Sequence, residues 1–384
     1  MGPLRLLILQ ATPYCNLNCT YCYLPDKSIR RRMGMDVIEQ SVARIAASGL
    51  INKSFSVVWH AGEPLAAGLR FYREADAAIR KHLPADITVK HCLQTNGTLI
   101  NKDWCQLFKD MPISVGVSID GPAFINDKFR VDRSGKGSLA QIERGVRCLQ
   151  EAGLSFHTIS VVTKDAVAQP DAIFQYLYSL GPDCIAFNVE EIEGVHDTSS
   201  LQSVTEEEFG QFMIRMHELS FAVGKPNLVR EFQHAHHAIM GSVRRGSRML
   251  AMENNPLSII NVDVDGNFSS FSPELLGMKH PVYGDFILGN FLRSGIEELK
   301  ESAKFQQMTQ EIEAGVKACQ ATCEYFHFCG GGAPSNKLYE NGSFHSAETM
   351  HCRMTKKVIT NIVLDRMESM LAHDLPEEYA ELMA

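Results

Sequence analysis

Short apolar runs alternate with longer segments whose apolar residues recur every three or four positions, up to about residue 190. The short runs predict buried strands, and the longer segments predict amphipathic helices. Repeated strand–helix units in this order are typical of a parallel α/β barrel or partial barrel. The predicted strands are 4–10, 55–60, 87–94, 113–119, 155–162 and 184–189, and the predicted helices are 35–49, 71–83, 101–110, 138–153 and 168–179.

The repeated pattern ends in the segment 191–209, where a polar loop leads into the start of a helix. We therefore expect a partial (β/α)6 barrel over 1–200, a bridging helical segment over 201–255 and a separate C-terminal domain over 256–384. In parallel barrels the chemistry lies at the carboxyl ends of the strands. The polar stretches "CNLNCTYC", "HAGEP", "QTNG" and "SIDGP" all fall at such ends.

Composition narrows the class of protein. The chain has 384 residues, 45% of them hydrophobic and 21% charged, which is ordinary for a globular protein. A formal net charge of -8 argues against a nucleic-acid partner. No apolar run is long enough to span a membrane, and the N-terminal run is predicted to be a strand rather than a signal peptide. We therefore expect a cytoplasmic protein without a membrane partner.

The cysteines indicate a metal site. There are 11 of them, an odd and mostly clustered set, which does not suit a disulfide framework. Cys15, Cys19 and Cys22 lie on one short loop, and the next cysteine, Cys92, is far away. A structural zinc ion usually takes four ligands, whereas three thiolates suit a [4Fe–4S] cluster with one iron left open. Zinc and plain buried thiols remain the alternatives.

The CxxxCxxC spacing follows a first strand and precedes "AGEP" at 61–64. In this it resembles the radical S-adenosylmethionine (radical SAM) enzymes, over essentially the whole chain. The resemblance implies that S-adenosyl-L-methionine chelates the open iron of a [4Fe–4S] cluster. Reductive cleavage of the bound cofactor would then yield a 5′-deoxyadenosyl radical. The protein's part would be to orient the cofactor and to exclude water.

The segment Ala61, Gly62 and Glu63 is similar to the family's glycine-rich segment that holds the methionine amino group. The first glycine of the family pattern is Ala61 here. An alanine is tolerated at that position if its φ is negative.

Four further residues resemble cofactor-binding positions of the family. Tyr21 resembles an aromatic residue beside the adenine, and Ser118 and Arg130 resemble groups that hold the ribose and the carboxylate. A guanidinium suits a carboxylate because its planar fork binds two oxygens. Asn96 lies at a strand end that faces the same mouth. The alternative for each is a polar residue that caps a turn.

The C-terminal third carries a second cysteine group. Four thiolates can fully ligate one auxiliary [4Fe–4S] cluster, and zinc is the alternative. The region resembles the SPASM domain of peptide-modifying radical enzymes, and the hairpin at 261–273 resembles that domain's upstream element. The resemblance is incomplete, because Ala333 and Phe271 stand where further cysteines occur. The four cysteines are Cys319, Cys323, Cys329 and Cys352.

The C-terminal pattern is most similar to that of maturases that form cyclophanes in ribosomally made glycine-rich-repeat peptides. Ser272 stands where a sulfatase-maturing relative has an acidic residue, so we rank that activity low. We expect a carbon–carbon crosslink between a side-chain β-carbon and an aromatic ring of a precursor peptide. The auxiliary cluster would accept an electron, and flavodoxin or ferredoxin would be the electron donor. Thioether formation, epimerisation, Ser or Cys oxidation and a non-enzymatic iron–sulfur protein are the alternatives.

The sequence offers several candidates for the group that acts on the substrate. Glu190 and Glu191 follow the sixth predicted strand, and Asp120 follows the fourth, so each is a candidate base at the barrel mouth. His60 precedes "AGEP" and is expected to touch substrate. The stretch "HAHH" at 234–237 is predicted to be a polar helix face rather than a metal site.

Overall fold

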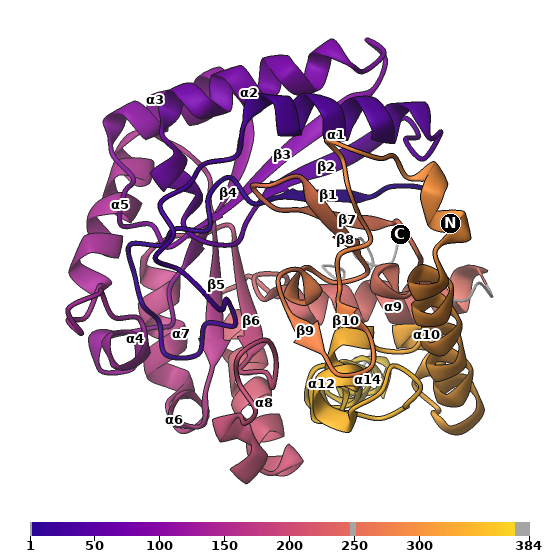
Figure 1. Ribbon diagram of the computed structural model, residues 1–384. Helices are drawn as coiled ribbons and strands as arrows, with labels where there is room; N and C mark the ends of the chain where they lie inside the picture. Colours follow the sequence, from indigo (N-terminus) through magenta and orange to yellow (C-terminus); the bar gives the residue numbers. More distant parts are fainter. Residues whose placement is uncertain (1, 246–250, 373–384) are drawn as a thin grey trace.

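A curved sheet of six parallel strands, joined by helices, forms the N-terminal part of the chain (Figure 1). The computed structural model describes residues 2–245 and 251–372. Strands that follow one another in the sequence are neighbours in the sheet, which confirms the predicted partial barrel. The strands are β1 (Leu6–Leu9), β2 (Ser54–Trp59), β3 (Thr88–Thr95), β4 (Ile113–Ser118), β5 (His157–Val162) and β6 (Cys184–Val189).

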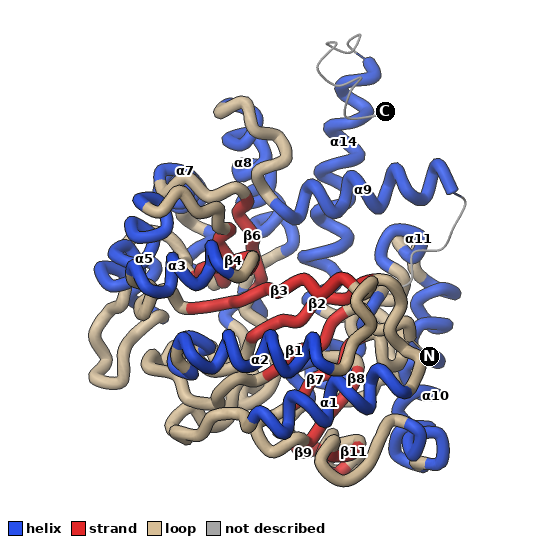
Figure 2. The backbone as a smooth tube through the Cα atoms, turned by 90° about the horizontal axis from the view of Figure 1, so that it is seen from above, coloured by secondary structure: helices blue, strands red, loops and turns tan. Residues whose placement is uncertain are grey.

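The connecting helices pack an apolar face against this sheet. In α1 the buried residues Val37, Ile38, Val42 and Ile45 recur at helical spacing. Figure 2 shows α1 and α2 running along one side of the strands. The helices of this part are α1 (Met35–Ala47), α2 (Leu69–Lys81), α3 (Lys102–Asp110), α4 (Ala123–Phe129), α5 (Leu139–Glu151), α6 (Lys164–Val167) and α7 (Pro170–Ser179).

The C-terminal region continues the same sheet. Strand β7 (Ile259–Val262) pairs in parallel with β1, and β8 (Asn267–Ser270) pairs antiparallel with β7. The short strand β11 (Gly289–Asn290) lies beyond β8. The described strands thus form one sheet in the order β11-β8-β7-β1-β2-β3-β4-β5-β6. The hairpin predicted at 261–273 therefore closes against the first barrel strand, while the domain limits at 200 and 255 stay a prediction.

Helices from the second half of the chain gather beside β6 and at the far end of the sheet (Figures 1 and 2). Helix α9 packs against both β6 and α14. No helix among residues 2–245 and 251–372 is long and apolar enough to cross a membrane. These helices are α8 (Glu206–Ala222), α9 (Arg230–Arg245), α10 (Ala303–Thr322), α11 (Phe326–Cys329), α12 (Pro334–Asn341), α13 (Met350–Cys352), a π-helical turn η6 (Arg353–Val358) and α14 (Ile359–Ala372). The remaining short elements are η1 (Pro64–Ala67), η2 (Ser200–Ser203), η3 (Met252–Asn254), η4 (Pro273–Leu275), η5 (Glu297–Glu301), β9 (Lys279–His280) and β10 (Gly284–Asp285).

Candidate active site

The loop that carries Cys15, Cys19 and Cys22 leaves the carboxyl end of β1 and is fixed by backbone hydrogen bonds. These bonds tie it to the segment after α4, so the loop is held in place by the chain itself. An arginine adds to this, because Arg133 Nη2 donates to the Cys15 carbonyl at 2.8 Å. The backbone bonds are Asn18 N to Val131 O (2.7 Å), Thr20 N to Phe129 O (3.0 Å) and Cys15 N to Lys27 O (3.0 Å).

The three thiols suit an iron–sulfur cluster. Burial, with the charge of Glu63 second, raises the pKa of Cys15 to about 12. Burial also raises the pKa of Cys19, and the charge of Arg130 opposes that shift. The thiols therefore need a cationic group before they ionise. Within residues 2–245 and 251–372, no three Cys, His, Asp or Glu side chains converge on one point as ligands of a single ion do. A cubane cluster does not require such convergence, because each thiolate binds its own iron.

A cavity of about 250 Å³ opens in front of the three thiols. It brings together the predicted residues of the barrel except Asp120, whereas Cys319, Cys323, Cys329 and Cys352 do not line it. The predicted residues that line it are Cys15, Cys19, Tyr21, Cys22, His60, Ala61, Gly62, Glu63, Asn96, Ser118, Arg130, Glu190 and Glu191.

The backbone at Ala61 and Gly62 turns sharply beneath the cysteine loop. Ala61 has φ 67° and Gly62 has φ 78°, so the condition under which an alanine is tolerated at position 61, a negative φ, is not met. A side chain at Gly62 would place its Cβ 2.2 Å from the Thr12 carbonyl oxygen. Close packing of this turn against the chain before Cys15 therefore imposes the left-handed conformation, and Ala61 bears its strain.

Replacing Ala61 with glycine should relieve that strain. We expect Ala61→Gly to raise the free energy of unfolding by about 1 kcal/mol, because glycine adopts positive φ without a steric cost. Urea denaturation of the cluster-free protein measures the change. Ala77, exposed within α2, is the control, where a glycine should lower stability by about 1 kcal/mol. Equal losses at the two positions would contradict the strain at Ala61.

Glu63 joins the ends of two strands. Its side chain is 1% exposed and accepts hydrogen bonds from Leu65 N (3.0 Å), Thr95 Oγ1 (2.7 Å) and Asn96 N (2.8 Å). Burial raises the pKa of this carboxyl, and the three donors oppose the shift. Glu63 thus holds the turn after β2 against the end of β3, and its predicted contact with the cofactor stays a prediction.

Arg130, Asp120 and Tyr21 form a buried group at one side of the cavity. Arg130 Nε lies 3.0 Å from Asp120 Oδ1, and the two side chains are 8% and 1% exposed. The Tyr21 hydroxyl donates to Asp120 Oδ2 at 2.5 Å, and its ring lies 5.5 Å from the Arg130 guanidinium carbon. Burial alone would lower the pKa of Arg130, but the charges of Asp120, Tyr21 and Cys19, together with the hydrogen bond to Asp120, outweigh burial and raise the pKa. The guanidinium therefore presents a fixed positive charge to the cavity.

Asn96 and Ser118 also reach the cavity from strand ends. Asn96 Nδ2 donates to Asn16 Oδ1 at 2.9 Å and lies 3.7 Å from Cys15 Sγ. Ser118 Oγ accepts from Gln94 Nε2 at 2.8 Å. Both side chains are therefore oriented by neighbours, and Gln94 is a lining residue that the sequence analysis missed.

The four predicted catalytic residues differ in how far hydrogen bonds and ion pairs already engage their polar atoms. Asp120 also accepts from Val161 N at 2.9 Å, so its oxygens are all engaged. Glu190 Oε2 accepts from Ser200 N at 2.9 Å and caps η2. His60 Nε2 lies 3.2 Å from the Tyr23 hydroxyl, and burial lowers the pKa of His60 to about 4, which keeps the ring neutral. Glu191 accepts from the Asn336 amide and lies 3.6 Å from His351 Nε2.

Two further carboxylates, Glu193 and Glu274, line the same cavity and were missed from the sequence. Burial and then the charge of Glu191 raise the pKa of Glu274 to about 8. Burial, Glu191 and Glu274 raise the pKa of Glu193 well above its ordinary value. The raised pKa values of Glu193 and Glu274 favour their protonated forms near neutral pH, which is a property of groups that exchange protons.

Glu274 has a partial signal in the sequence, because it lies two residues after Ser272, the position where sulfatase-maturing relatives carry an acidic residue. Phe271 takes φ 74°, and the chain then turns through η4, which includes Glu274. This turn brings the carboxyl of Glu274 to the cavity.

The second cysteine group also fits a cluster. Gly331 N donates to Cys329 Sγ at 3.4 Å, and Thr349 N donates to Cys352 Sγ at 3.2 Å. Such N–H···S bonds are a common feature of iron–sulfur sites. Cys319 is close enough to Cys323 and Cys329 for their charges to raise its pKa, after burial as the main cause. Lys357 is close enough to feel the charges of both Cys323 and Cys352, which places Cys352 near this group. The four thiols therefore lie near one another, where α10, α11 and α13 end.

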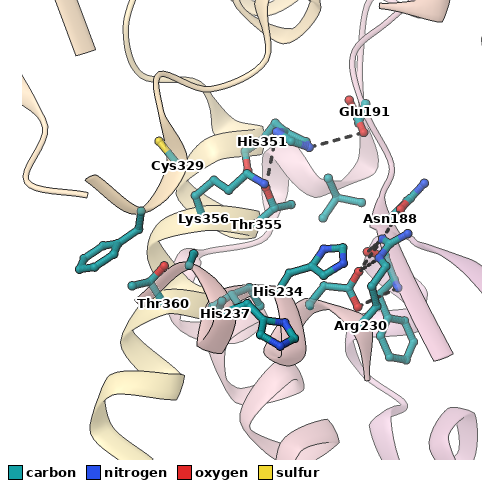
Figure 3. A pocket seen from close by; sticks show the side chains of 17 residues that line it. Asn188, Glu191, Arg230, His234, His237, Cys329, His351, Thr355, Lys356 and Thr360 are labelled. Carbon is teal, nitrogen blue, oxygen red and sulfur yellow. Dashed lines mark hydrogen bonds and ion pairs between the residues drawn. The ribbon is translucent and has the colours of Figure 1, made fainter. Parts of the chain in front are cut away.

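A second cavity, of about 480 Å³, neighbours the first and reaches Cys329 of this group. Asn188, Val189 and Glu191 line both cavities, and Cys329 lines only the second. Figure 3 shows His351 reaching across to Glu191, and His234 and His237 on the facing helix α9. The "HAHH" stretch is thus part of a cavity wall. Its predicted reading as a solvated polar face agrees with the exposure of His234 and His237.

Comparisons with known proteins agree with this arrangement. The sequence model of the Radical SAM superfamily matches residues 9–177. An uncharacterised protein of Synechocystis sp. is 42% identical over 375 residues, which cover 96% of this chain and 94% of that protein. A serine-type anaerobic sulfatase-maturating enzyme of Klebsiella aerogenes is 35% identical over 214 residues, or 55% of this chain and 53% of that enzyme. The match to the Klebsiella enzyme therefore spans only about half of either protein.

A solved structure of native anSMEcpe with bound AdoMet and the Kp18Cys peptide superposes with a TM-score of 0.75. It is 23% identical and covers 96% of this chain and 99% of that one, which shows a shared fold. Residues 9–177 match the radical SAM superfamily, and the protein is an enzyme that uses S-adenosyl-L-methionine and a [4Fe–4S] cluster.

Proposed function

We propose that this enzyme modifies a ribosomally made precursor peptide by forming a carbon–carbon crosslink, a cyclophane, between an aromatic ring and a side-chain β-carbon. One observation carries the proposal. Two neighbouring cavities share the lining residues Asn188, Val189 and Glu191; the thiols of the Cys15–Cys22 loop line the first, and Cys329 of the second cysteine group lines the second. A peptide that occupies both cavities would lie between two redox sites and beside a group of carboxylates.

The net reaction removes two hydrogens from the peptide. One leaves the β-carbon as a hydrogen atom, and one leaves the aromatic ring as a proton and an electron while the new bond forms. When bound, S-adenosylmethionine and the loop cluster supply a hydrogen-abstracting radical, and one auxiliary [4Fe–4S] cluster supplies an acceptor for the electron. An external donor such as flavodoxin or ferredoxin must provide the reducing electron.

The residues of this chain position the reactants and move the proton. Arg130 offers its charge to the methionine carboxylate, and Ser118 and Asn96 offer polar groups at neighbouring strand ends. The neutral His60 ring and the Tyr23 hydroxyl form a wall opposite them. Glu274 accepts the ring proton, because a base works best when its pKa lies near the operating pH.

Oxidation of a Ser or Cys side chain is the second candidate. It is favoured by the 35% identity to the Klebsiella enzyme and by the carboxylate of Glu274 in the cavity. Serine oxidation also removes two hydrogens, so the mass change alone does not separate it from crosslinking. It leaves an aldehyde, however, and a crosslink does not.

Coexpression with a candidate precursor, under anaerobic conditions, tests the proposal. We expect a peptide that lacks two hydrogens, does not react with an aminooxy probe, and resists fragmentation between the two joined residues. Reaction with the probe would establish the second candidate instead. An unchanged mass with an inverted α-carbon would establish epimerisation, and both outcomes would overturn the crosslink.

The number of irons per chain should show that each of the two cysteine groups holds its own cluster. We expect about eight irons per chain after anaerobic reconstitution, since two four-iron clusters fit the thiols. Cys352→Ala should retain about four irons, because one auxiliary thiolate is lost. The control is Cys148→Ala on α5, a partly buried thiol away from both groups, which should keep all of them. Zinc in place of the auxiliary irons would contradict the electron-accepting role.

A further inference from the structure

Lys337 is a lysine buried deep in the C-terminal region. It lies on α12, its side chain is 2% exposed, and its Nζ makes no hydrogen bond within the described part of the chain. A buried ammonium without a partner costs several kcal/mol, so such groups are almost always paired. The sequence analysis had given this residue no role.

The ammonium of Lys337 lies beside Cys319, one of the second group of thiols. Burial raises the pKa of Cys319, whereas the positive charge of Lys337 and its close approach to the thiol oppose that rise. A Cβ on Gly315 of α10 would lie 3.2 Å from Nζ, and a Cβ on Gly332 would lie 3.8 Å from Cε. Glycines on both sides thus leave room for the lysine to reach the thiols.

We propose that Lys337 is the buried counter-cation of a four-thiolate iron–sulfur cluster at Cys319, Cys323, Cys329 and Cys352, and that it raises the reduction potential of this cluster. A cluster held by four thiolates carries a net negative charge, and this charge explains why an otherwise unpaired ammonium is buried there. A zinc ion with the same four ligands does not change its charge during turnover.

The proposal deepens the proposed function, because it rests on the auxiliary cluster as the electron acceptor. Reduction adds one negative charge to the cluster. A cation fixed close by in a medium of low dielectric stabilises the reduced state more than the oxidised state. Lys337 therefore favours transfer of the ring's electron to the cluster.

The test measures the potential without any peptide. The triple substitution Cys15→Ala, Cys19→Ala and Cys22→Ala removes the loop cluster, so the remaining signal belongs to the auxiliary site. In this background we compare Lys337, Lys337→Met and Lys337→Arg by redox titration with electron paramagnetic resonance. We expect Lys337→Met to disfavour reduction at least tenfold, which is a shift of about 59 mV to lower potential. Lys337→Arg should stay near the parent value.

Lys357→Met is the matched control. Lys357 is also close enough to feel the charges of Cys323 and Cys352, but it is partly exposed and already paired with Glu348. Solvent and the paired carboxylate screen its charge, so its removal should shift the potential far less than Lys337→Met does.

Iron content and potential of the Lys337 variants either support or overturn the proposed role of this lysine. Loss of the four irons in Lys337→Met but not in Lys337→Arg would support it, since the charge would then be required for assembly. A full cluster with an unchanged potential in Lys337→Met would overturn it. Loss of iron in both variants, or zinc at the site, would overturn it as well. The crosslinking assay is independent of the redox titration. An enzyme that shows the expected potentials but forms no crosslink would contradict the proposed function and not the role of Lys337.

Discussion

Glu274→Gln should lower the rate of peptide crosslinking by about a hundredfold or more, the usual contribution of a general base. Glutamine keeps the shape and the polar contacts of the side chain but does not accept the proton. Cleavage of S-adenosylmethionine should continue, because Arg130, Asn96 and Ser118, the residues proposed to hold the cofactor, are unchanged in this variant. Crosslinked peptide and 5′-deoxyadenosine, measured together by chromatography and mass spectrometry, should therefore become uncoupled in the variant.

The pH dependence makes this test sharper. Burial and the neighbouring Glu191 raise the pKa of Glu274 to about 8. A base acts in its ionised form, so crosslinking should increase as the pH rises through about 8 in the parent enzyme. The same increase should be absent from Glu274→Gln.

The stability of the folded protein should fall as the pH rises, whereas crosslinking should increase. The folded pKa of Glu274 lies above its ordinary value of 4.5, so the folded state binds more protons than the unfolded chain between these two values. Its contribution to the free energy of unfolding is therefore lost as the pH rises from about 4.5 to about 8. Glu274→Gln should be more stable than the parent at pH 8, as measured by thermal unfolding.

Glu313→Gln is the control for this variant. Glu313 is an exposed glutamate on α10, so its neutralisation should change neither crosslinking nor stability noticeably. Equal crosslinking in Glu274→Gln and Glu313→Gln would remove Glu274 from the proton-accepting role. An equal loss of 5′-deoxyadenosine and crosslink in Glu274→Gln would instead indicate damage to cofactor binding.

The parallel barrel could be predicted because its signals are local. Apolar runs such as 184–189 and the amphipathic spacing of 35–49 need no tertiary knowledge, and their order fixes the strand neighbours. The cysteine loop and the polar strand ends converge for the same reason, since parallel strands end at one edge. The predicted site residues of the barrel, except Asp120, therefore line one cavity.

What could not be predicted depends on contacts between distant segments. The pairing of β7 with β1 joins residues about 250 positions apart in the sequence and leaves no local signal. Glu274 and Lys337 reach their sites only because that hairpin and α12 fold back over the barrel. The left-handed backbone of Ala61 was missed because the Thr12–Tyr14 segment that imposes it approaches from another part of the chain.

The buried pair of Asp120 and Arg130 gives the largest expected change in stability. We expect Asp120→Asn to lower the free energy of unfolding by about 3–5 kcal/mol, because the guanidinium would stay buried without its counter-charge. Asparagine keeps the size of the side chain and can still accept a hydrogen bond, so the loss reports the charge. Urea denaturation of the cluster-free protein at pH 7 measures the difference.

An exposed pair supplies the comparison. Arg215 Nη2 lies 2.7 Å from Asp171 Oδ1, but these side chains are 43% and 49% exposed. Asp171→Asn should therefore cost only about 0–1 kcal/mol. The double substitution Asp120→Asn with Arg130→Met should recover much of the stability, because no uncompensated charge then remains buried. If Asp120→Asn lowers the free energy of unfolding no more than Asp171→Asn does, Asp120 does not hold the Arg130 charge in place. The proposed contact of Arg130 with the methionine carboxylate would then lose its support.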